Sequence, residues 1–413
     1  MIAVFTALAV GFKLPMGLAV AFAALAGALA GGQGLAIRHL VEGAFGFFDV
    51  ILIIATAMIF MKVLEESGLL DSLVAAILKT FYRRKVALLL TVMLLLMFPG
   101  MITGSSLAAV LSTGPLIAPV LMKLGLPRLR TAAFVALGSV LGMIAPPVNI
   151  LIMIMGAGVD MPYTGLTLPL LLATVPAAVV IALGLGLRRI RVVSKDEMTA
   201  LLPAARSPRR GLILYLPILL VLALMVLQNL DVPFFPTLGL PAIFILGSLT
   251  GMVCGRRFNV LRAARTAIAQ SVPILSILAG VGMFIQIMTL TGGRGWLVTS
   301  FLSLPAALVY AGVAAGLPLF GGISAYGSAS VLGVPFLLAL AGNNALIIAS
   351  ALSAIVGIGD LMPPAAMAAR FSGQVVGESN VFKVLRECVW PALLLLAVGI
   401  GMLLAAPVLG KIL

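Results

Sequence analysis

The 413-residue sequence contains few charged side chains and few of the groups that enzymes use for catalysis or metal binding. Asp, Glu, Lys and Arg make up 9% of it, and it has one histidine and two cysteines. Neither Cys254 nor Cys388 has neighbours spaced as metal ligands, and the apolar runs hold no cluster of His and Asp, which argues against a membrane enzyme. The nucleotide-binding pattern Gly-x-x-x-x-Gly-Lys is missing, so an ATPase of that type is excluded.

Apolar residues dominate instead. Hydrophobic side chains make up 62% of the sequence and the mean hydropathy is +1.27, far outside the range of globular proteins. The fold class predicted is an all-α polytopic membrane protein embedded in the lipid bilayer. The net charge of +14 does not indicate nucleic-acid binding, because the basic residues form short clusters between apolar runs, as in loops at an anionic membrane surface.

The most irregular stretch is 99–119. It carries no charge but holds five hydroxyl side chains, three glycines and three prolines, a mixture that predicts a broken, non-helical backbone. Such a backbone cannot face hydrocarbon, since each unpaired N–H or C=O there costs several kcal/mol; it must be buried in protein or line a wet cavity. We interpret 99–122 as a re-entrant hairpin that forms a binding site.

The pattern occurs twice. A second hairpin with the same small and hydroxyl residues begins about 221 residues after the first, and two Pro-Pro pairs, 146–147 and 363–364, lie 217 residues apart. Two landmarks thus share one period, which indicates an internal duplication. The predicted division is a first repeat at 1–187 with hairpin 99–122 and broken helix 128–158, a basic cytoplasmic linker at 188–211, and a second repeat at 212–413 with hairpin 319–342 and broken helix 343–376.

Orientation follows from charge. We count five crossings in each half, because the run 86–98 reaches only about 20 Å at 1.5 Å per residue, short of the roughly 30 Å membrane core. An odd number of crossings inverts the second half relative to the first. With both termini periplasmic, all but three of the 26 Lys and Arg residues face the cytoplasm. In this topology Lys62–Lys85 is a cytoplasmic loop, and Arg38–Glu42, which contains the single histidine His39, is an exterior loop.

Inverted repeats with broken helices are typical of secondary transporters. The helix breaks leave half-helix N-termini that favour anions and free carbonyls that bind cations. Hydroxyl and carbonyl oxygens are hard donors suited to Na⁺, and both hairpins lack the Asp, Glu and His that a proton-driven carrier needs. A channel is a weaker alternative, because the duplication is present and no charged or carbonyl-repeat filter is.

Candidate site residues come from the hairpins and the helix breaks. The candidate Na⁺ ligands are Ser105, Ser106, Ala145, Pro146, Ser324, Ser328, Gly359 and Met362. The candidate substrate contacts are Thr103, Gly104, Asn149, Gly327, Asn343, Asp360 and Arg370. Asp360 leaves two readings open: it restores proton coupling if it titrates, or it caps or pairs locally. Arg370 either meets a substrate carboxylate or extends to the cytoplasmic interface.

Several motifs, in this order, resemble the large membrane subunit of the tripartite ATP-independent periplasmic (TRAP) transporters of the ion transporter superfamily. They are Gly104-Ser105-Ser106, the Gly-Met-Ile-Ala-Pro-Pro run at 142–147, the Gly-rich second hairpin ending at Pro335, Pro363-Pro364, and Val389-Trp390-Pro391 with Pro407. The likeness extends over almost the whole chain.

The resemblance implies an elevator-type fold in a bacterial inner membrane and Na⁺-driven uptake of an organic anion such as a dicarboxylate or sialic acid. It also implies a small four-helix membrane subunit and a periplasmic substrate-binding protein as partners. The chain departs from the family pattern at Val148-Asn149, where Ser is usual, and at Met362, where Thr is usual. The exact cation ligands therefore stay open, as does a related Na⁺- or H⁺-coupled carrier that works without a binding protein.

Overall fold

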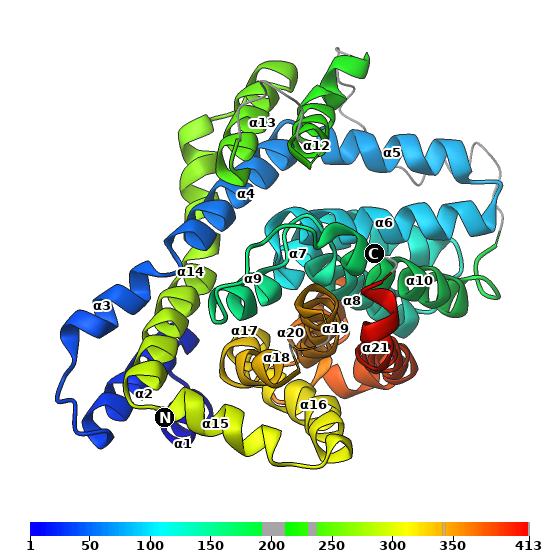
Figure 1. Ribbon diagram of the computed structural model, residues 1–413. Helices are drawn as coiled ribbons and strands as arrows, with labels where there is room; N and C mark the ends of the chain where they lie inside the picture. Colours follow the sequence, from blue (N-terminus) through cyan, green and yellow to red (C-terminus); the bar gives the residue numbers. More distant parts are fainter. Residues whose placement is uncertain (192–210, 230–237, 341, 343, 412–413) are drawn as a thin grey trace.

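The computed structural model describes residues 1–191, 211–229, 238–340, 342 and 344–411, and the regular structure within these ranges is entirely helical (Figure 1). The first half contains α1 (Ile2–Thr6), η1 (Ala7–Gly11), α2 (Met16–Ala30), α3 (Ile37–Phe45), α4 (Phe48–Glu66), α5 (Leu69–Phe81), α6 (Lys85–Thr103), α7 (Ser106–Lys123), α8 (Arg128–Ile144), α9 (Ile150–Ala157) and α10 (Thr167–Gly186). The second half contains η2 (Gly211–Tyr215), α12 (Leu216–Asn229), α13 (Leu240–Cys254), α14 (Val260–Leu290), α15 (Gly293–Leu302), α16 (Ala306–Gly321), α17 (Ala325–Ser328), η3 (Ala329–Gly333), α18 (Val334–Leu340), α19 (Ala345–Gly357), η5 (Ile358–Leu361), α20 (Met367–Val376) and α21 (Val381–Leu409).

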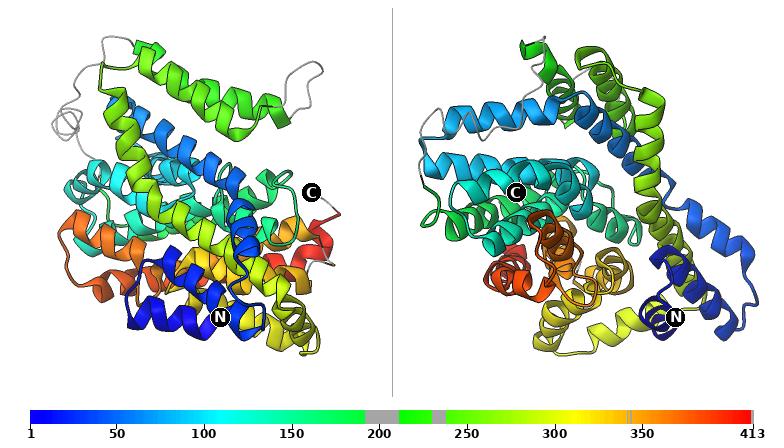
Figure 2. Two further views of the ribbon diagram at one scale, coloured as in Figure 1. Left: turned by 90° about the vertical axis from the view of Figure 1, so that its left-hand side faces the viewer. Right: turned by 180° about the vertical axis from the view of Figure 1, so that it is seen from behind.

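The helices form an inner bundle and an outer wall. Helices α6 to α10 and α16 to α21 make the bundle, and the long helix α14 runs beside it with α2, α3 and α4 packed against its length (Figures 1 and 2). Helices α5 and α15 connect wall to bundle at opposite ends of the molecule. The predicted site residues that the structure describes lie in the bundle.

The contacts between elements follow the same scheme in both halves. Helix α2 packs on α14 as α13 packs on α4, α6 packs on α8 as α16 packs on α19, and α20 packs on α7 as α9 packs on η3. Two glycine pairs also correspond: a Cβ on Gly100 would lie 2.8 Å from the Gly142 carbonyl carbon, and a Cβ on Gly321 would lie 2.8 Å from the Gly359 Cα. Each hairpin therefore packs closely against its own broken helix at a position where both segments need glycine.

The prediction that 99–119 is too broken to be helical is wrong. Helix α6 continues through Pro99 to Thr103, α7 begins at Ser106 and continues through Pro115 and Pro119, and only two residues separate the helices. Three of the five hydroxyl groups in the stretch are satisfied within the helices: Thr103 Oγ1 donates to the Pro99 carbonyl at 2.7 Å, and Ser112 and Thr113 donate to carbonyls four residues earlier. Of the three prolines within the helices, Pro99 is buried, and Pro115 and Pro119 are exposed.

The length argument about 86–98 also fails. Helix α6 has 19 residues and is therefore about 28 Å long. By length and hydropathy it is one of five described helices able to span a membrane, or of six if α3 and α4, which bend by 44°, form one span.

Two segments expected to be loops contain helices. The segment Lys62–Lys85 holds the end of α4 and all of α5, whose apolar face buries Leu69, Leu70 and Leu78. The segment Arg38–Glu42 is part of α3, where Arg38 pairs with Glu42 at 2.7 Å and His39 is half-exposed. Both segments were predicted to be loops because they are rich in charge, but short amphipathic helices also carry charge on one face.

Candidate functional site

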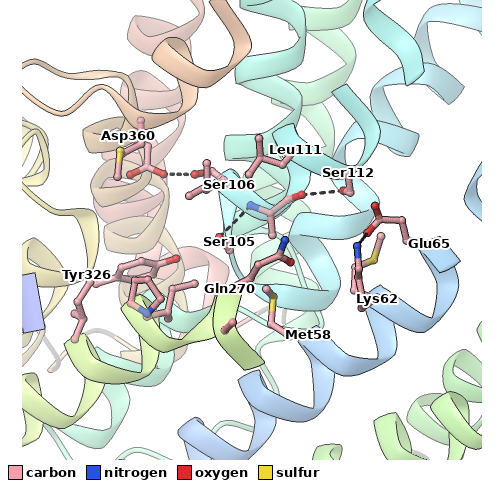
Figure 3. A pocket seen from close by; sticks show the side chains of 18 residues that line it. Met58, Lys62, Glu65, Ser105, Ser106, Leu111, Ser112, Gln270, Tyr326 and Asp360 are labelled. Carbon is pink, nitrogen blue, oxygen red and sulfur yellow. Dashed lines mark hydrogen bonds and ion pairs between the residues drawn. The ribbon is translucent and has the colours of Figure 1, made fainter. Parts of the chain in front are cut away.

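A cavity of about 380 Å³ lies between the outer wall and the turn of the first hairpin (Figure 3). The wall contributes α4 and α14, and the bundle contributes the turn between α6 and α7 with residues of α17, η5 and α20. Its polar lining consists of Lys62, Glu65, Ser105, Ser106, Ser112, Gln270, Tyr326 and Asp360.

The first hairpin turns at Gly104 and Ser105. Gly104 has φ +63°, which favours glycine, and a Cβ there would lie 2.5 Å from Cγ1 of Ile150 at the start of α9. Ser105 caps α7, its Oγ accepting from the Ala108 N–H at 3.3 Å. The turn thus brings two serine hydroxyls, those of Ser105 and Ser106, to the cavity wall.

The first helix break lies against this turn. Residues 145–149 separate α8 from α9 and contain a cis Pro146–Pro147 bond. The Val148 N–H donates to the Met101 carbonyl at 3.1 Å, which ties the break to α6. Within the described ranges the carbonyl oxygens of Ala145 and Pro146 accept no hydrogen bond, although both residues are buried. Two buried, unused carbonyls next to a hydroxyl-rich turn form a donor set that suits a hard cation such as Na⁺.

Asn149 closes the first break from within the protein. It is fully buried, caps α9 by accepting from the Ile152 N–H at 3.1 Å, and donates from Nδ2 to the Ile144 carbonyl at 2.9 Å and to Ser353 Oγ at 2.6 Å. Asn149 does not line the cavity, and its side chain is instead held by these three hydrogen bonds. Its role is to join the first break to α19 of the other half.

The second hairpin turns at Ser324. Its Oγ accepts from the Gly327 N–H at 3.1 Å and caps α17, as Ser105 caps α7. The Tyr326 hydroxyl donates to the Gly104 carbonyl at 3.1 Å, so the two hairpin turns are in contact. Phe5 of α1 is fully buried and packs against Phe320, with ring centroids 5.7 Å apart and ring planes tilted by 31°, and it also lies beside Gly327.

The second helix break follows η5. The Ala365 N–H donates to the Gly322 carbonyl at 2.9 Å, the counterpart of the Val148 bond. The carbonyls of Gly359 and Met362 accept backbone N–H groups at 2.9 and 3.0 Å, so each has one lone pair already in use. Asp360 accepts a hydrogen bond at Oδ2 from the Ser106 hydroxyl, which joins the second break to the first hairpin.

The predicted residues separate into groups. Ser105, Ser106 and Asp360 meet at the cavity. Thr103 and Ser328 are fully buried and bonded to the backbone of their own hairpins, Ser328 to the Leu317 carbonyl at 2.8 Å. Arg370 is exposed, donates to the Pro364 carbonyl at 3.2 Å and lines a different cavity of about 470 Å³, and Asn343 lies outside the described residues.

Sequence reasoning missed six polar residues. Five of them line the cavity: Lys62, Glu65, Ser112, Gln270 and Tyr326. The sixth, Ser330, has a buried hydroxyl that makes no hydrogen bond. Ser330 lies in the π-helical turn η3, a type of irregularity common at functional sites. The Ser-rich pattern of the second hairpin already contained it. Among the described residues, no cluster of three or more His, Cys, Asp and Glu side chains could hold a metal ion.

The fold of this helical bundle is shared by solved structures of membrane transporters. The YdaH transporter of Alcanivorax borkumensis matches with a TM-score of 0.59 and 19% identity over 88% of this chain and 86% of its own. MtrF of Neisseria gonorrhoeae, from a class of antimetabolite efflux pumps, matches with a TM-score of 0.59 and 14% identity over 89% of this chain and 83% of its own. At these identities the likeness shows the fold alone.

The family described as tripartite ATP-independent periplasmic transporter, DctM component, matches residues 1–409. The chain belongs to this family, and the resemblance seen in the motifs is confirmed. It is a TRAP-type secondary transporter component and not an enzyme. A comparison with curated protein sequences found no match.

Proposed function

We propose that this chain is the large membrane subunit of a TRAP transporter and that a Na⁺ gradient drives its uptake of an organic anion into the cell. A periplasmic binding protein delivers the anion, and a small four-helix membrane subunit completes the complex in the bacterial inner membrane. Family membership supports the class of transporter. The coupling ion, the anion and the partners are part of the proposal.

The observation that carries the proposal is the contact of the first hairpin turn with the first helix break. Ser105 lies on the turn, and the unused carbonyls of Ala145 and Pro146 lie on the break. When bound there, Na⁺ supplies a positive charge that holds the hairpin against the broken helix. Hard oxygen donors in a buried site favour this ion.

A second cation position is proposed at the corresponding turn and break of the second half. Ser324 and the carbonyls of Gly359 and Met362 are its candidate ligands, as the sequence suggested. Ser328 contributes less than expected, because its hydroxyl is bonded to the Leu317 carbonyl. Ser330 is the stronger candidate, since its buried hydroxyl oxygen makes no hydrogen bond.

The substrate is proposed to bind in the 380 Å³ cavity between wall and bundle. Of the described candidates for substrate contact, Asp360 alone lines it; Thr103, Gly104, Asn149, Gly327 and Arg370 do not. The matching order and contacts of elements in the two halves support inverted repeats, and the grouping of the helices into a wall and a bundle supports an elevator movement of the bundle.

Na⁺ dependence is the test. The unfolding temperature of the purified chain is measured in NaCl and in choline chloride at equal ionic strength. We expect Na⁺ to raise it, and Ser105→Ala to raise the half-maximal Na⁺ concentration at least fivefold. Equal unfolding temperatures in both salts would contradict Na⁺ coupling. Na⁺-driven uptake into liposomes by this chain alone would favour the carrier that needs no binding protein.

A further inference from the structure

The cavity contains a carboxylate that has no basic partner. Oδ2 of Asp360 accepts from the Ser106 hydroxyl, and Ser106 is the first residue of α7. The ion pairs among the described residues join Arg38 or His39 to Glu42, Lys62 to Glu65 and Glu66, and Arg130 to Glu387. None of them involves Asp360, so no Lys, Arg or His nitrogen of the described chain lies within 4.0 Å of its oxygens.

The one basic residue in the cavity lining is already neutralised. Lys62 lies 3.0 Å from Glu65 and 3.6 Å from Glu66. The charged side chains that line the cavity are therefore Lys62, Glu65 and Asp360, and their formal charges leave one negative charge in excess. An organic anion entering this space would meet net repulsion.

The other groups around Asp360 do not supply a positive charge. The α7 N-terminus and the Ser106 hydroxyl favour the ionised carboxylate, but only with a partial charge and one hydrogen bond. Tyr326 of α17 donates its hydroxyl to Gly104, and α14 contributes the neutral Gln270. From α20, Met367 faces the cavity, while Arg370 bonds Pro364 in another cavity. An ionised carboxylate held away from water without a charged partner is costly, so it either takes up a proton or binds a positive ligand.

We propose that Asp360 binds a single positive charge that enters from the cavity: an alkali cation or the ammonium group of an organic substrate. Oδ2 is held by Ser106, and Oδ1 is the ligand atom that remains. The proposal rests on the transporter function proposed above and adds a carboxylate position to the cation positions made of hydroxyls and carbonyls. With this charge bound, the cavity lining is neutral and a substrate carboxylate can enter.

The test uses the purified full chain at one pH and constant ionic strength, with choline chloride as the balancing salt. NaCl and ethylammonium chloride are titrated separately, and the unfolding temperature is followed for wild type, Asp360→Asn and Asp160→Asn. The control is matched, because Asp160 is exposed outside the cavity and its φ of +57° suits asparagine. We expect Asp360→Asn to raise the half-maximal concentration of one cation at least tenfold, and Asp160→Asn to leave both titrations as in wild type.

The two arms separate the sources of the charge. A loss confined to Na⁺ assigns an alkali cation, and a loss confined to ethylammonium assigns the ammonium group of a substrate. The proposal is overturned if the titrations of Asp360→Asn coincide with those of wild type for both cations. That result is also the one expected if Asp360 is protonated and binds no cation, because asparagine mimics a protonated aspartate. A wild-type chain insensitive to Na⁺ contradicts the proposed Na⁺ coupling while the ethylammonium arm still decides the inference.

A second variant, Ser106→Ala, tests the proposal if Asp360→Asn does not fold. Ser106→Ala removes the hydrogen bond that orients the carboxylate and keeps its charge. We expect the half-maximal concentration of the same cation to shift at least threefold. A wild-type titration of Ser106→Ala, measured on protein that stays monodisperse, would count against the site.

Discussion

The two hairpin turns have the same local design but different surroundings. Ser105 and Ser324 each follow the end of a helix and cap the next one, and each turn is tied to its own helix break by one backbone hydrogen bond. The first turn faces the 380 Å³ cavity, whereas Phe5 packs against Phe320 and Gly327 of the second hairpin. Two turns of similar design in different surroundings are what a carrier needs to expose one site to two sides in turn.

The chemistry of the two turns also differs. The first residue of α7 is Ser106, bonded to Asp360 across the halves. In the second hairpin the first residue of α17, at the position that corresponds to Ser106, is Ala325. The residue 217 positions before Asp360 is Met143, which is fully buried. The duplication kept the backbone geometry and placed a charge at one junction only. This difference is why a carboxylate ligand for a cation is expected at the first hairpin, whereas the cation position proposed at the second consists of hydroxyl and carbonyl oxygens alone.

The largest expected effect is that of opening the second turn. Phe5→Ala removes a fully buried ring from the Phe320 contact and should cost about 3–5 kcal/mol of stability. It should also speed the reaction of a maleimide with a cysteine introduced at the half-buried Ser324, because Phe5 lies beside Gly327 of the same hairpin. Phe12→Ala, at a residue that is 75% exposed, is the matched control. Equal labelling of Ser324→Cys with and without Phe5 would mean that Phe5 does not close this turn.

The turns also differ in backbone demand. Gly104 precedes Ser105 with φ +63° and contacts Ile150, whereas Ile323 precedes Ser324 without a positive φ. Gly104→Ala should cost about 1–2 kcal/mol for the backbone and about 1–3 kcal/mol for the clash. Gly32→Ala is the control, because Gly32 has φ +72° with no atom near its Cβ position. Equal losses of unfolding temperature in the two variants would rule out the close contact with α9.

The two helix breaks differ in their caps. Asn149 caps α9 and bonds Ser353, while its counterpart Ala366 gives α20 no side-chain cap. Asn149→Ala should lower the free energy of unfolding by about 1–3 kcal/mol, because it leaves buried polar groups unpaired. Asn380→Ala removes an exposed cap of α21 and should cost about 1 kcal/mol. An Asn149→Ala variant no less stable than Asn380→Ala would remove Asn149 from the contact between the halves.

The smallest change in stability is expected at Ser330. Its buried hydroxyl makes no hydrogen bond, so Ser330→Ala should leave the unfolding temperature without Na⁺ within the measurement error. The rise produced by Na⁺ should become smaller if the hydroxyl binds the ion. Ser350→Ala, at a fully buried serine bonded to the Leu346 carbonyl, controls for loss of a hydroxyl. An undiminished Na⁺ effect in Ser330→Ala would exclude it as a ligand.

Pattern alone predicted much of the fold. Composition indicated the membrane class, and the spacing of the Pro-Pro pairs located both helix breaks, because proline and glycine act on the backbone within a few residues. Helices α3 and α5 were missed, since amphipathic helices rich in charge resemble loops, and the continuity of α6 through Pro99 depends on packing. The site was harder, because it forms between halves: the contact of Ser106 with Asp360 joins residues 254 positions apart.

Accessibility from the two faces of the membrane tests the account most directly. In a chain whose buried Cys254 and Cys388 are replaced by alanine, single cysteines at Ala108, in the cavity lining, and at Ser324, in the Phe5→Ala background, are exposed to an impermeant maleimide in vesicles of known orientation. The account predicts that Ala108→Cys reacts only from the cytoplasmic face and Ser324→Cys only from the periplasmic face. Labelling of both from one face would contradict it.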